Sequence, residues 1–292
     1  MATLYDQVSS NNRKAFFLIF FFLIFVIFIG WFFSYVFNDV FILYVAVIIS
    51  TIMSFVSYYE SDKIILSMSH AFEIKKSDNP ELYRIVENLA ITAGLPMPKV
   101  YILEERQANA FATGRDEKHA VIAVTRGLLD KLDKRELTAV VAHEMSHIRG
   151  KDILIGSIVV VLVGVISILS DIFMRSLFWG GNDNDNKNPI FLIFGIIGII
   201  LAPIAASLMQ LAISRKQEFK ADANASLLTR DPEALISALT KISSDKTSLK
   251  QANNATAHLY IASPFKNKVE WYNKLFMTHP PLEERIKALR LI

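Results

Sequence analysis

The sequence predicts an α-helical membrane protein with four transmembrane helices and a soluble α+β domain that the second pair of helices divides. Of its 292 residues, 52% are hydrophobic, and the mean hydropathy of +0.35 exceeds that of ordinary soluble domains. The apolar residues are concentrated in four stretches. Between the second and third stretches, short strand-like runs alternate with amphipathic helical patterns.

Stretches 15–37 and 190–213 carry no charge, and each is longer than the roughly 20 residues with which a helix crosses a bilayer. Residues 40–57 are uncharged but shorter, and residues 153–173 are uncharged as far as Asp171. Either middle stretch could instead be a buried helix or part of a re-entrant hairpin. The first stretch is too long for the apolar part of a signal peptide, so we expect a retained anchor.

These stretches divide the chain into four parts: a polar tail with spans one and two (1–57), the first part of the soluble domain (58–152), spans three and four with a short external loop (153–213), and the second part of the domain (214–292). Basic residues flank the spans on the side of the tail and of both domain parts: Arg13, Lys14, Lys63, Arg149, Lys151, Arg215 and Lys216. The positive-inside rule therefore places the N-terminus, the domain and the C-terminus in the cytoplasm. Four crossings satisfy this arrangement, whereas three or five do not.

The first part of the domain alternates helices and strands. Helical periodicity covers residues 80–93, with Pro80 near the start and Gly94 after the end. Strand-like runs occupy 99–103, 109–113 and 120–125, and a short helix at about 128–132 follows them. In the second part, helices are expected over 214–228, from 232 onward and over 282–291, and residues 243–270 show no clear period.

A longer helix is expected to contain His143-Glu144-Met145-Ser146-His147. Positions four apart lie on one helix face, so His143 and His147 can bind one metal ion, with Glu144 beside them. This is the HExxH arrangement of zinc hydrolases, in which the glutamate is the general base. Asp133 and Glu136 form a capping box at the start of this helix, which supports the helical geometry that the motif requires.

A catalytic zinc site needs a third protein ligand. The sequence contains no cysteine, so zinc must be held by histidines and carboxylates. Glu218 is the best candidate, and Asp222, four residues later on the same helix face, could accept the free N–H of a zinc-bound imidazole. On spacing alone, both residues also fit a solvated charged helix. His147 and Glu218 would lie at similar short distances from the same membrane face.

The HExxH motif, the run Glu218-Phe219-Lys220-Ala221-Asp222 and the four spans together resemble the HtpX family over nearly the whole chain. These are membrane zinc metalloproteases of protein quality control, related to the CAAX prenyl endopeptidases. The resemblance implies a zincin-like domain and one zinc ion per chain, held by His143, His147 and Glu218. It also implies that Glu144 is the catalytic base, that Asp222 supports a ligand, and that the protein lies in a bacterial inner membrane.

Two further stretches are similar to elements of this family. Asn109-Ala110-Phe111 looks like its edge strand, along which a substrate backbone would pair by strand addition. The alternative is an ordinary hairpin strand. His279 and Arg285 match a late His-Pro-Pro and Arg element, in which His279 would donate to the developing oxyanion and Arg285 would pair with an active-site carboxylate. A histidine before two prolines can also be purely structural.

The resulting hypothesis is an endopeptidase that cleaves unfolded or membrane proteins at the cytoplasmic surface of the lipid bilayer. A CAAX-type peptidase would use the same chemistry. A transporter with a structural zinc site is disfavoured because the central parts of the spans carry no charge. A scaffold without activity would not need Glu144. The net charge of +3 is too small to indicate a nucleic-acid partner, and the sequence does not predict an oligomeric state.

Overall fold

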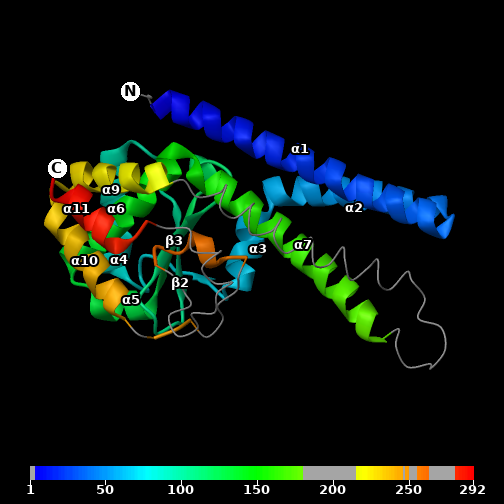
Figure 1. The fold of residues 1–292 in the computed structure, drawn as a ribbon. Coiled ribbons are helices and arrows are strands. Elements are labelled where there is room, and N and C mark those ends of the chain that lie inside the picture. Colours follow the sequence, from blue (N-terminus) through cyan, green and yellow to red (C-terminus); the bar gives the residue numbers. More distant parts are fainter. Residues whose placement is uncertain (1–3, 180–214, 246, 250–254, 263–279) are drawn as a thin grey trace.

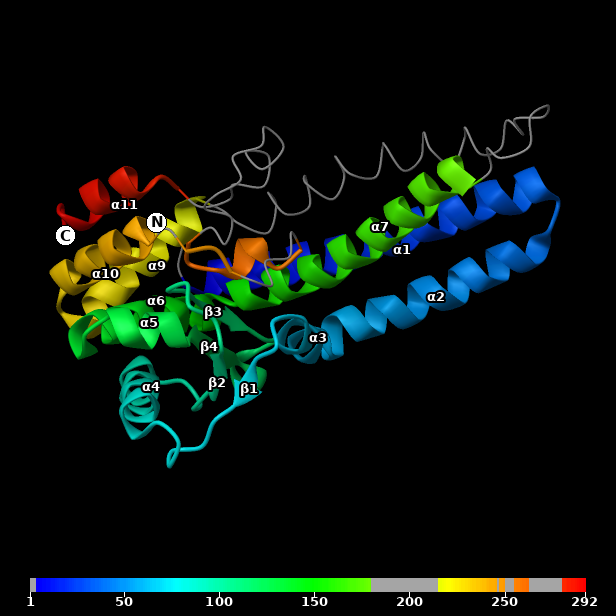
Figure 2. The ribbon, with the colours of Figure 1, turned by 90° about the horizontal axis from the view of Figure 1, so that it is seen from below.

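The computed structural model describes residues 4–179, 215–245, 247–249, 255–262 and 280–292. Three long helices, α1 (Leu4–Phe37), α2 (Val40–Tyr59) and α7 (Asp152–Trp179), project from one side of the domain formed by the other elements (Figures 1 and 2). The fourth expected span, 190–213, and His279 lie outside the described residues.

Within the described part of the chain, three helices are long and apolar enough to cross a membrane: Asp6–Phe37, Phe41–Tyr59 and Asp152–Asp171. The two middle stretches, 40–57 and 153–173, therefore lie in continuous helices and are not re-entrant hairpins. Aromatic side chains such as Phe21 and Phe41 point outward and are 63% and 68% exposed in the protein alone. This is the surface expected of helices that face lipid.

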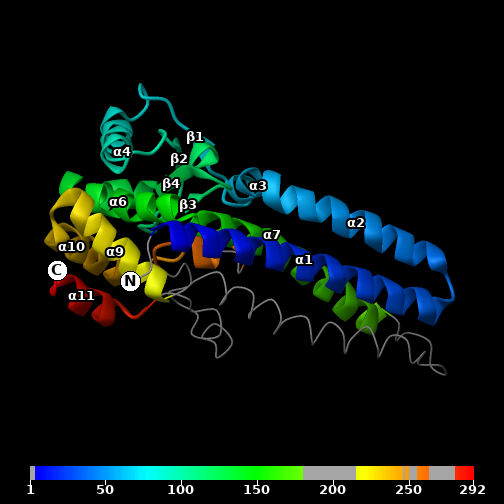
Figure 3. The ribbon, with the colours of Figure 1, turned by 90° about the horizontal axis from the view of Figure 1, so that it is seen from above.

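The first two helices run antiparallel and pack side by side (Figures 1 and 3). The turn between them contains Asn38, whose φ of 52° lies in the left-handed region, and Asp39, whose side chain caps α2 by accepting from Phe41 N at 2.9 Å. A Cβ at Gly30 would lie 2.1 Å from the Cβ of Ala46. The glycine thus lets the two helix backbones meet closely, as small residues do in membrane helix pairs.

A four-stranded sheet forms the centre of the domain. Its strands are β1 (Phe72–Glu73), β2 (Lys99–Leu103), β3 (Ala110–Thr113) and β4 (Val121–Thr125), in the order β1-β2-β4-β3. β2 and β4 are parallel, and the other two pairs are antiparallel. The sequence predicts the last three strands to within one residue, whereas β1 has only two residues and shows no pattern of its own. β3 lies at the sheet edge, and it begins at Ala110 rather than at the expected Asn109.

Seven further α-helices are described: α3 (Ser61–Met68), α4 (Pro80–Ala93), α5 (Arg126–Lys131), α6 (Lys134–Gly150), α9 (Arg215–Thr229), α10 (Pro232–Ser244) and α11 (Leu282–Leu289). Local signals fix the ends of α4. Asn79 accepts from Leu82 N at 3.0 Å, Pro80 occupies the first turn, and Gly94 ends the helix with a φ of 68°. In the 243–270 region, the described residues include the end of α10 and a short 3₁₀ turn at Ala257–Leu259.

Helix α6 lies in the core, in contact with α4, α9, α10 and β3 (Figure 2). Both bonds of the predicted capping box, between Asp133 and Glu136, are present. Val140, Val141 and Met145 are fully buried, and burial of side chains of this size stabilises a fold by roughly 1.5–3 kcal/mol each. The helix that carries the motif is therefore held rigidly on nearly all sides.

Helices α6 and α7 are separated by a single residue, Lys151, which adopts the left-handed conformation with a φ of 55°. Its N–H bonds back to Ile148 O at 3.1 Å and closes the last turn of α6. The chain then starts the membrane helix at Asp152. This short junction fixes the position of the motif relative to the membrane helix.

Candidate metal centre

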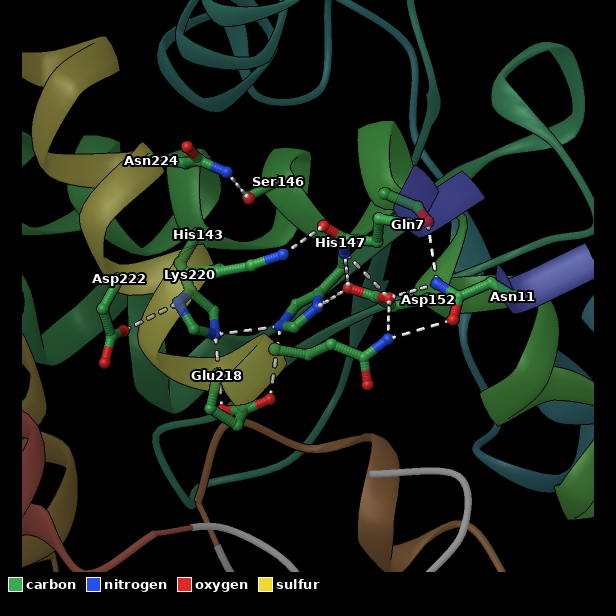
Figure 4. A network of polar contacts seen from close by, with 12 residues as sticks. Gln7, Asn11, His143, Ser146, His147, Asp152, Glu218, Lys220, Asp222 and Asn224 are labelled. Atoms are coloured by element: carbon green, nitrogen blue, oxygen red, sulfur yellow. Dashed lines mark hydrogen bonds and ion pairs between the residues drawn. The ribbon is translucent and has the colours of Figure 1, made fainter. Parts of the chain in front are cut away.

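The two motif histidines and Glu218 converge on one point between α6 and α9 (Figure 4). The Nε2 atoms of His143 and His147 are 3.2 Å apart. Glu218 places Oε2 3.8 Å from His143 Nε2 and Oε1 3.4 Å from His147 Nε2. One donor atom from each residue lies within 4.8 Å of the other two, so the three form a set that could hold a metal ion. The structure thus brings together the three ligands that the sequence predicts.

Each imidazole meets a carboxylate through its other nitrogen. His143 Nδ1 lies 2.9 Å from Asp222 Oδ1, and His147 Nδ1 lies 3.1 Å from Asp152 Oδ2. Because an ionised carboxylate only accepts hydrogen bonds, each Nδ1 carries the proton and each Nε2 presents its lone pair to the shared point. Two such imidazoles and a carboxylate match the His₂Glu donor set of catalytic zinc sites.

The charges around the site favour a cation at this point. Burial alone would lower the pKa of His147, but the hydrogen bond to Asp152 and the charge of Glu218 outweigh burial and raise the pKa to about 9. The site is therefore stabilised by positive charge between the imidazoles and the carboxylate, which a divalent ion supplies. The chemistry of the residues thus fits zinc.

Glu144 is buried beside the ligands, and its carboxylate accepts a hydrogen bond from the backbone N–H of Ala112 on β3. Burial raises the pKa of Glu144, although the nearby His143 and His147 oppose the shift. A carboxyl group whose pKa lies closer to neutrality exchanges protons more readily at working pH. The position suits a general base next to the sheet edge.

Asp222 is shared between His143 and Arg285, which is 2% exposed. Arg285 donates from Nε to Asp222 Oδ2 at 2.8 Å and from Nη2 to Oδ1 at 2.6 Å. Burial alone would raise the pKa of Asp222, but the bonds from Arg285 and His143 hold it far below its usual range. The arginine also lies 3.7 Å from Glu218, so it balances the negative charge behind the ligands.

The expected substrate edge is only partly open. Ala110 O accepts from Ile261 N at 3.1 Å, and the side chain of Asn109 donates to Ala262 O at 2.8 Å and accepts from Ala262 N at 3.2 Å. The ring of Phe111 is buried and packs edge-on against Tyr260, with centroids 5.1 Å apart. In the described part of the chain, Ile261 and Ala262 therefore occupy the edge of the strand at Asn109 and Ala110.

Asp152 is a site residue that the sequence does not reveal. It stands five positions after His147, across the end of a helix, so no helical period links the two. Gln217 and Asn11, which both contact Asp152, are equally inconspicuous in the sequence. Of the other residues named from the sequence, Asp222 lies beside His143, and Arg285 lies beside Asp222.

Comparisons with known proteins agree with this site. The pattern of peptidase family M48 matches residues 76–292. The chain is 43% identical to a protease HtpX homologue of Caldanaerobacter subterraneus subsp. tengcongensis, over 99% of this chain and 97% of that protein. It is also 43% identical to a protease HtpX homologue of Lactobacillus acidophilus, over 98% of this chain and 99% of the relative.

Among solved structures, a crystal structure of Ste24p from S. mikatae shares the fold, with a TM-score of 0.50 and 20% identity, over 98% of this chain and 66% of that chain. The family pattern covers the motif helix, α9 and α11 together, and the relatives extend the similarity to the membrane helices. The chain therefore belongs to peptidase family M48 and is a membrane-associated metalloprotease of the HtpX type.

Proposed function

We propose that this protein is a zinc endopeptidase that hydrolyses peptide bonds of misfolded or membrane proteins at the cytoplasmic face of a bacterial inner membrane, in protein quality control. The observation that supports the proposal is the convergence of His143, His147 and Glu218 on one point. Glu144 lies beside these ligands and accepts a hydrogen bond from the edge strand β3. The same centre lies one short turn from the membrane helix α7.

Each site residue has a defined role in this proposal. His143, His147 and Glu218 hold the metal, and bound zinc would polarise the scissile carbonyl and acidify the attacking water. Glu144 takes a proton from that water and delivers it to the leaving amine. Asp222 and Arg285 keep His143 oriented.

Substrate residues would pair by strand addition with the segment Asn109-Ala110-Phe111 and its continuation to Ala112, along the part of its edge after Ala110 that Ile261 and Ala262 do not occupy. Such pairing uses main-chain hydrogen bonds and therefore tolerates many sequences, as quality control requires. His279, at which the sequence places an oxyanion donor, would act on the developing negative charge of the substrate. Because α6 leads directly into α7, peptides close to the bilayer surface would reach the site most easily.

The orientation in the membrane is part of the proposal, as is the division of the domain into 58–152 and 214–292 by the spans. The chain contains no cysteine, so single cysteines can report the side on which a segment lies. Cysteines introduced at Ser9 and Lys76 should react with an impermeant thiol reagent only after the inner membrane is opened. Labelling of either position in intact spheroplasts would exclude the cytoplasmic orientation.

The function is tested with the wild-type protein and the Glu144→Gln variant, purified in detergent without chelator. We expect about one zinc ion per chain in both and cleavage of casein by the wild type alone, because the amide cannot accept the proton. The Glu81→Gln variant, altered at an exposed position of α4, should cleave normally. Casein cleavage by Glu144→Gln would refute the role of Glu144, and a wild type without zinc would refute the metalloprotease assignment of this site.

A further inference from the structure

A network of polar side chains lies behind His147, on the side away from the point where His143, His147 and Glu218 converge (Figure 4). Its centre is Asp152, which accepts a hydrogen bond from Asn11 Nδ2 at 2.6 Å. Gln217 Nε2 donates to the same oxygen, Oδ1, at 2.5 Å, and Gln7 Nε2 lies 3.3 Å from both oxygens. The three amides come from helices α1 and α9, whereas Asp152 begins α7.

Asn11 connects all the helices that meet at this point. It is 1% exposed, although it lies in the first membrane helix. Its Nδ2 also donates to Gly150 O at 2.9 Å, at the end of α6, and its Oδ1 accepts from Gln217 Nε2 at 3.2 Å. Every polar atom of this side chain is thus hydrogen-bonded, which a buried amide requires.

The two oxygens of Asp152 have different partners. The main donors, Asn11 and Gln217, both bind Oδ1, and Oδ2 faces His147 Nδ1 at 3.1 Å. The amides therefore fix the rotation of the carboxylate, and the carboxylate in turn fixes the imidazole ring. An acidic residue at the first position of α7 would also stabilise that helix through its dipole, but this role needs neither the buried amides nor the imidazole.

We propose that Asp152 is the positioning residue of the metal ligand His147, and that the first membrane helix, through Asn11, holds Asp152 in place. The inference rests on the proposed zinc function and extends it. Helix α1 is then a supporting element of the metal centre as well as a membrane anchor. A displacement of its end near the domain would release Oδ1 of Asp152 and loosen His147.

Zinc affinity measures this support without reference to activity. The full-length protein in detergent is stripped of metal and titrated with zinc in competition with a chromophoric chelator. Removal of a residue that orients a metal-bound histidine typically weakens metal binding about 10- to 100-fold. We expect a loss in this range for Asp152→Ala and a loss of at most about tenfold for Asn11→Ala. Asn12→Ala is the matched control, because Asn12 is the exposed neighbour of Asn11 on the same helix, and its zinc affinity should equal that of the wild type.

Two further measurements separate positioning from folding. The visible spectrum of the Co²⁺-loaded protein reports ligand geometry, and it should change in Asp152→Ala and Asn11→Ala but not in Asn12→Ala. Gln217→Ala removes the other main donor to the same oxygen and should weaken zinc binding in the same direction. If Asn11→Ala proves unstable as judged by thermal unfolding of the metal-free protein, Gln7→Ala, which removes the other amide that α1 directs at Asp152, decides the question.

The outcomes are distinguishable from a failure of the proposed function. If the wild type and Asn12→Ala bind zinc and Asp152→Ala binds it equally well with an unchanged cobalt spectrum, the inference is wrong and the zinc site stands. A loss of affinity in Asn11→Ala with none in Asp152→Ala would mean that α1 acts by packing, which also overturns the inference. A wild-type protein that binds no zinc would overturn the function and this inference together.

Discussion

Arg285 and Asp222 form a buried bidentate ion pair, in which Nε donates to Oδ2 at 2.8 Å and Nη2 donates to Oδ1 at 2.6 Å. Asp222 in turn contacts His143 Nδ1 at 2.9 Å. The last described helix, α11, thereby supports a metal ligand on α6 through a residue of α9. This chain of a guanidinium, a carboxylate and an imidazole has consequences for both stability and metal binding.

The first prediction concerns this pair. In Arg285→Ala, the buried Asp222 keeps its desolvation cost and loses its counterion, so the free energy of unfolding should fall by about 3–5 kcal/mol. Arg285→Lys should recover only part of the loss, because a single ammonium group cannot bind both oxygens in the same way. Denaturant unfolding in detergent measures both variants. The exposed Arg290, on the turn after α11, provides the control Arg290→Ala, and an Arg285→Ala variant as stable as this control would contradict the prediction.

The second prediction concerns the metal ligands. His143→Ala, His147→Ala and Glu218→Gln should each lose most of the bound zinc, since each removes one of three protein donors. His119→Ala, which changes an exposed histidine in a different part of the domain, should retain it. Metal analysis of the purified proteins is the measurement. Full zinc content in Glu218→Gln would remove Glu218 from the ligand set.

The same set predicts the effect of metal removal on stability. A ligand that binds only the folded state stabilises it by about 2.7 kcal/mol when its free concentration is 100 times the dissociation constant. Chelator should therefore lower the unfolding midpoint of the wild type, and added zinc should restore it. In Glu218→Gln the midpoint should respond to neither addition, and an equal response in both proteins would show that the effect arises elsewhere.

The third prediction concerns pH and the start of α6. Burial alone would raise the pKa of Glu136, but hydrogen bonds from Lys241 Nζ at 2.7 Å and Ser237 Oγ at 2.6 Å outweigh burial, and the pKa lies below its usual 4.5. A carboxyl group whose pKa is lower in the folded than in the unfolded protein stabilises the fold at pH values above its unfolded-state pKa. This stabilisation is lost as the pH falls through the folded-state pKa.

Glu136→Gln should accordingly lower the free energy of unfolding at pH 7 by roughly 1–2 kcal/mol. The difference from the wild type should shrink as the pH falls below about 4.5. Thermal unfolding at a series of pH values is the measurement. Glu233→Gln, at an exposed position of α10, is the control. A difference that grows toward acid pH would show that the carboxylate has a different role.

The fourth prediction concerns the strand edge. Asn109→Ala removes both side-chain hydrogen bonds to Ala262, and each buried group left without a partner costs about 1–3 kcal/mol. The backbone at 255–262 should then exchange its amide hydrogens faster, as followed by hydrogen–deuterium exchange. Asn88→Ala, on the exposed face of α4, is the control. Unchanged exchange at Ile261 and Ala262 would mean that Asn109 does not hold this segment at the edge.

Much of the architecture can be predicted from the sequence because its signals are local. The charge-free stretches predict the membrane helices, and Asn79, Pro80 and Gly94 delimit α4. The helical spacing of His143 and His147, and that of Glu218 and Asp222, places both pairs on the faces that the structure brings together.

What could not be predicted depends on contacts between distant segments. Asn11 and Asp152 are 141 positions apart, and neither residue belongs to a recognisable motif. The contact of His147 with Asp152 depends on the left-handed conformation of Lys151, which joins α6 to α7 and which a lysine in the sequence does not predict. The pairing of Ile261 with the edge of β3 arises in a segment without any period.

The metal centre is also assembled from parts that leave the ribosome at different times. His143 and His147 are translated well before Glu218, and the arginine that neutralises Asp222 follows later still. Because nascent domains fold from the N-terminal side as they emerge, a growing chain holds two imidazoles without the third ligand until α9 has been made. The order of synthesis thus leaves the set of three metal ligands incomplete until α9 has been produced.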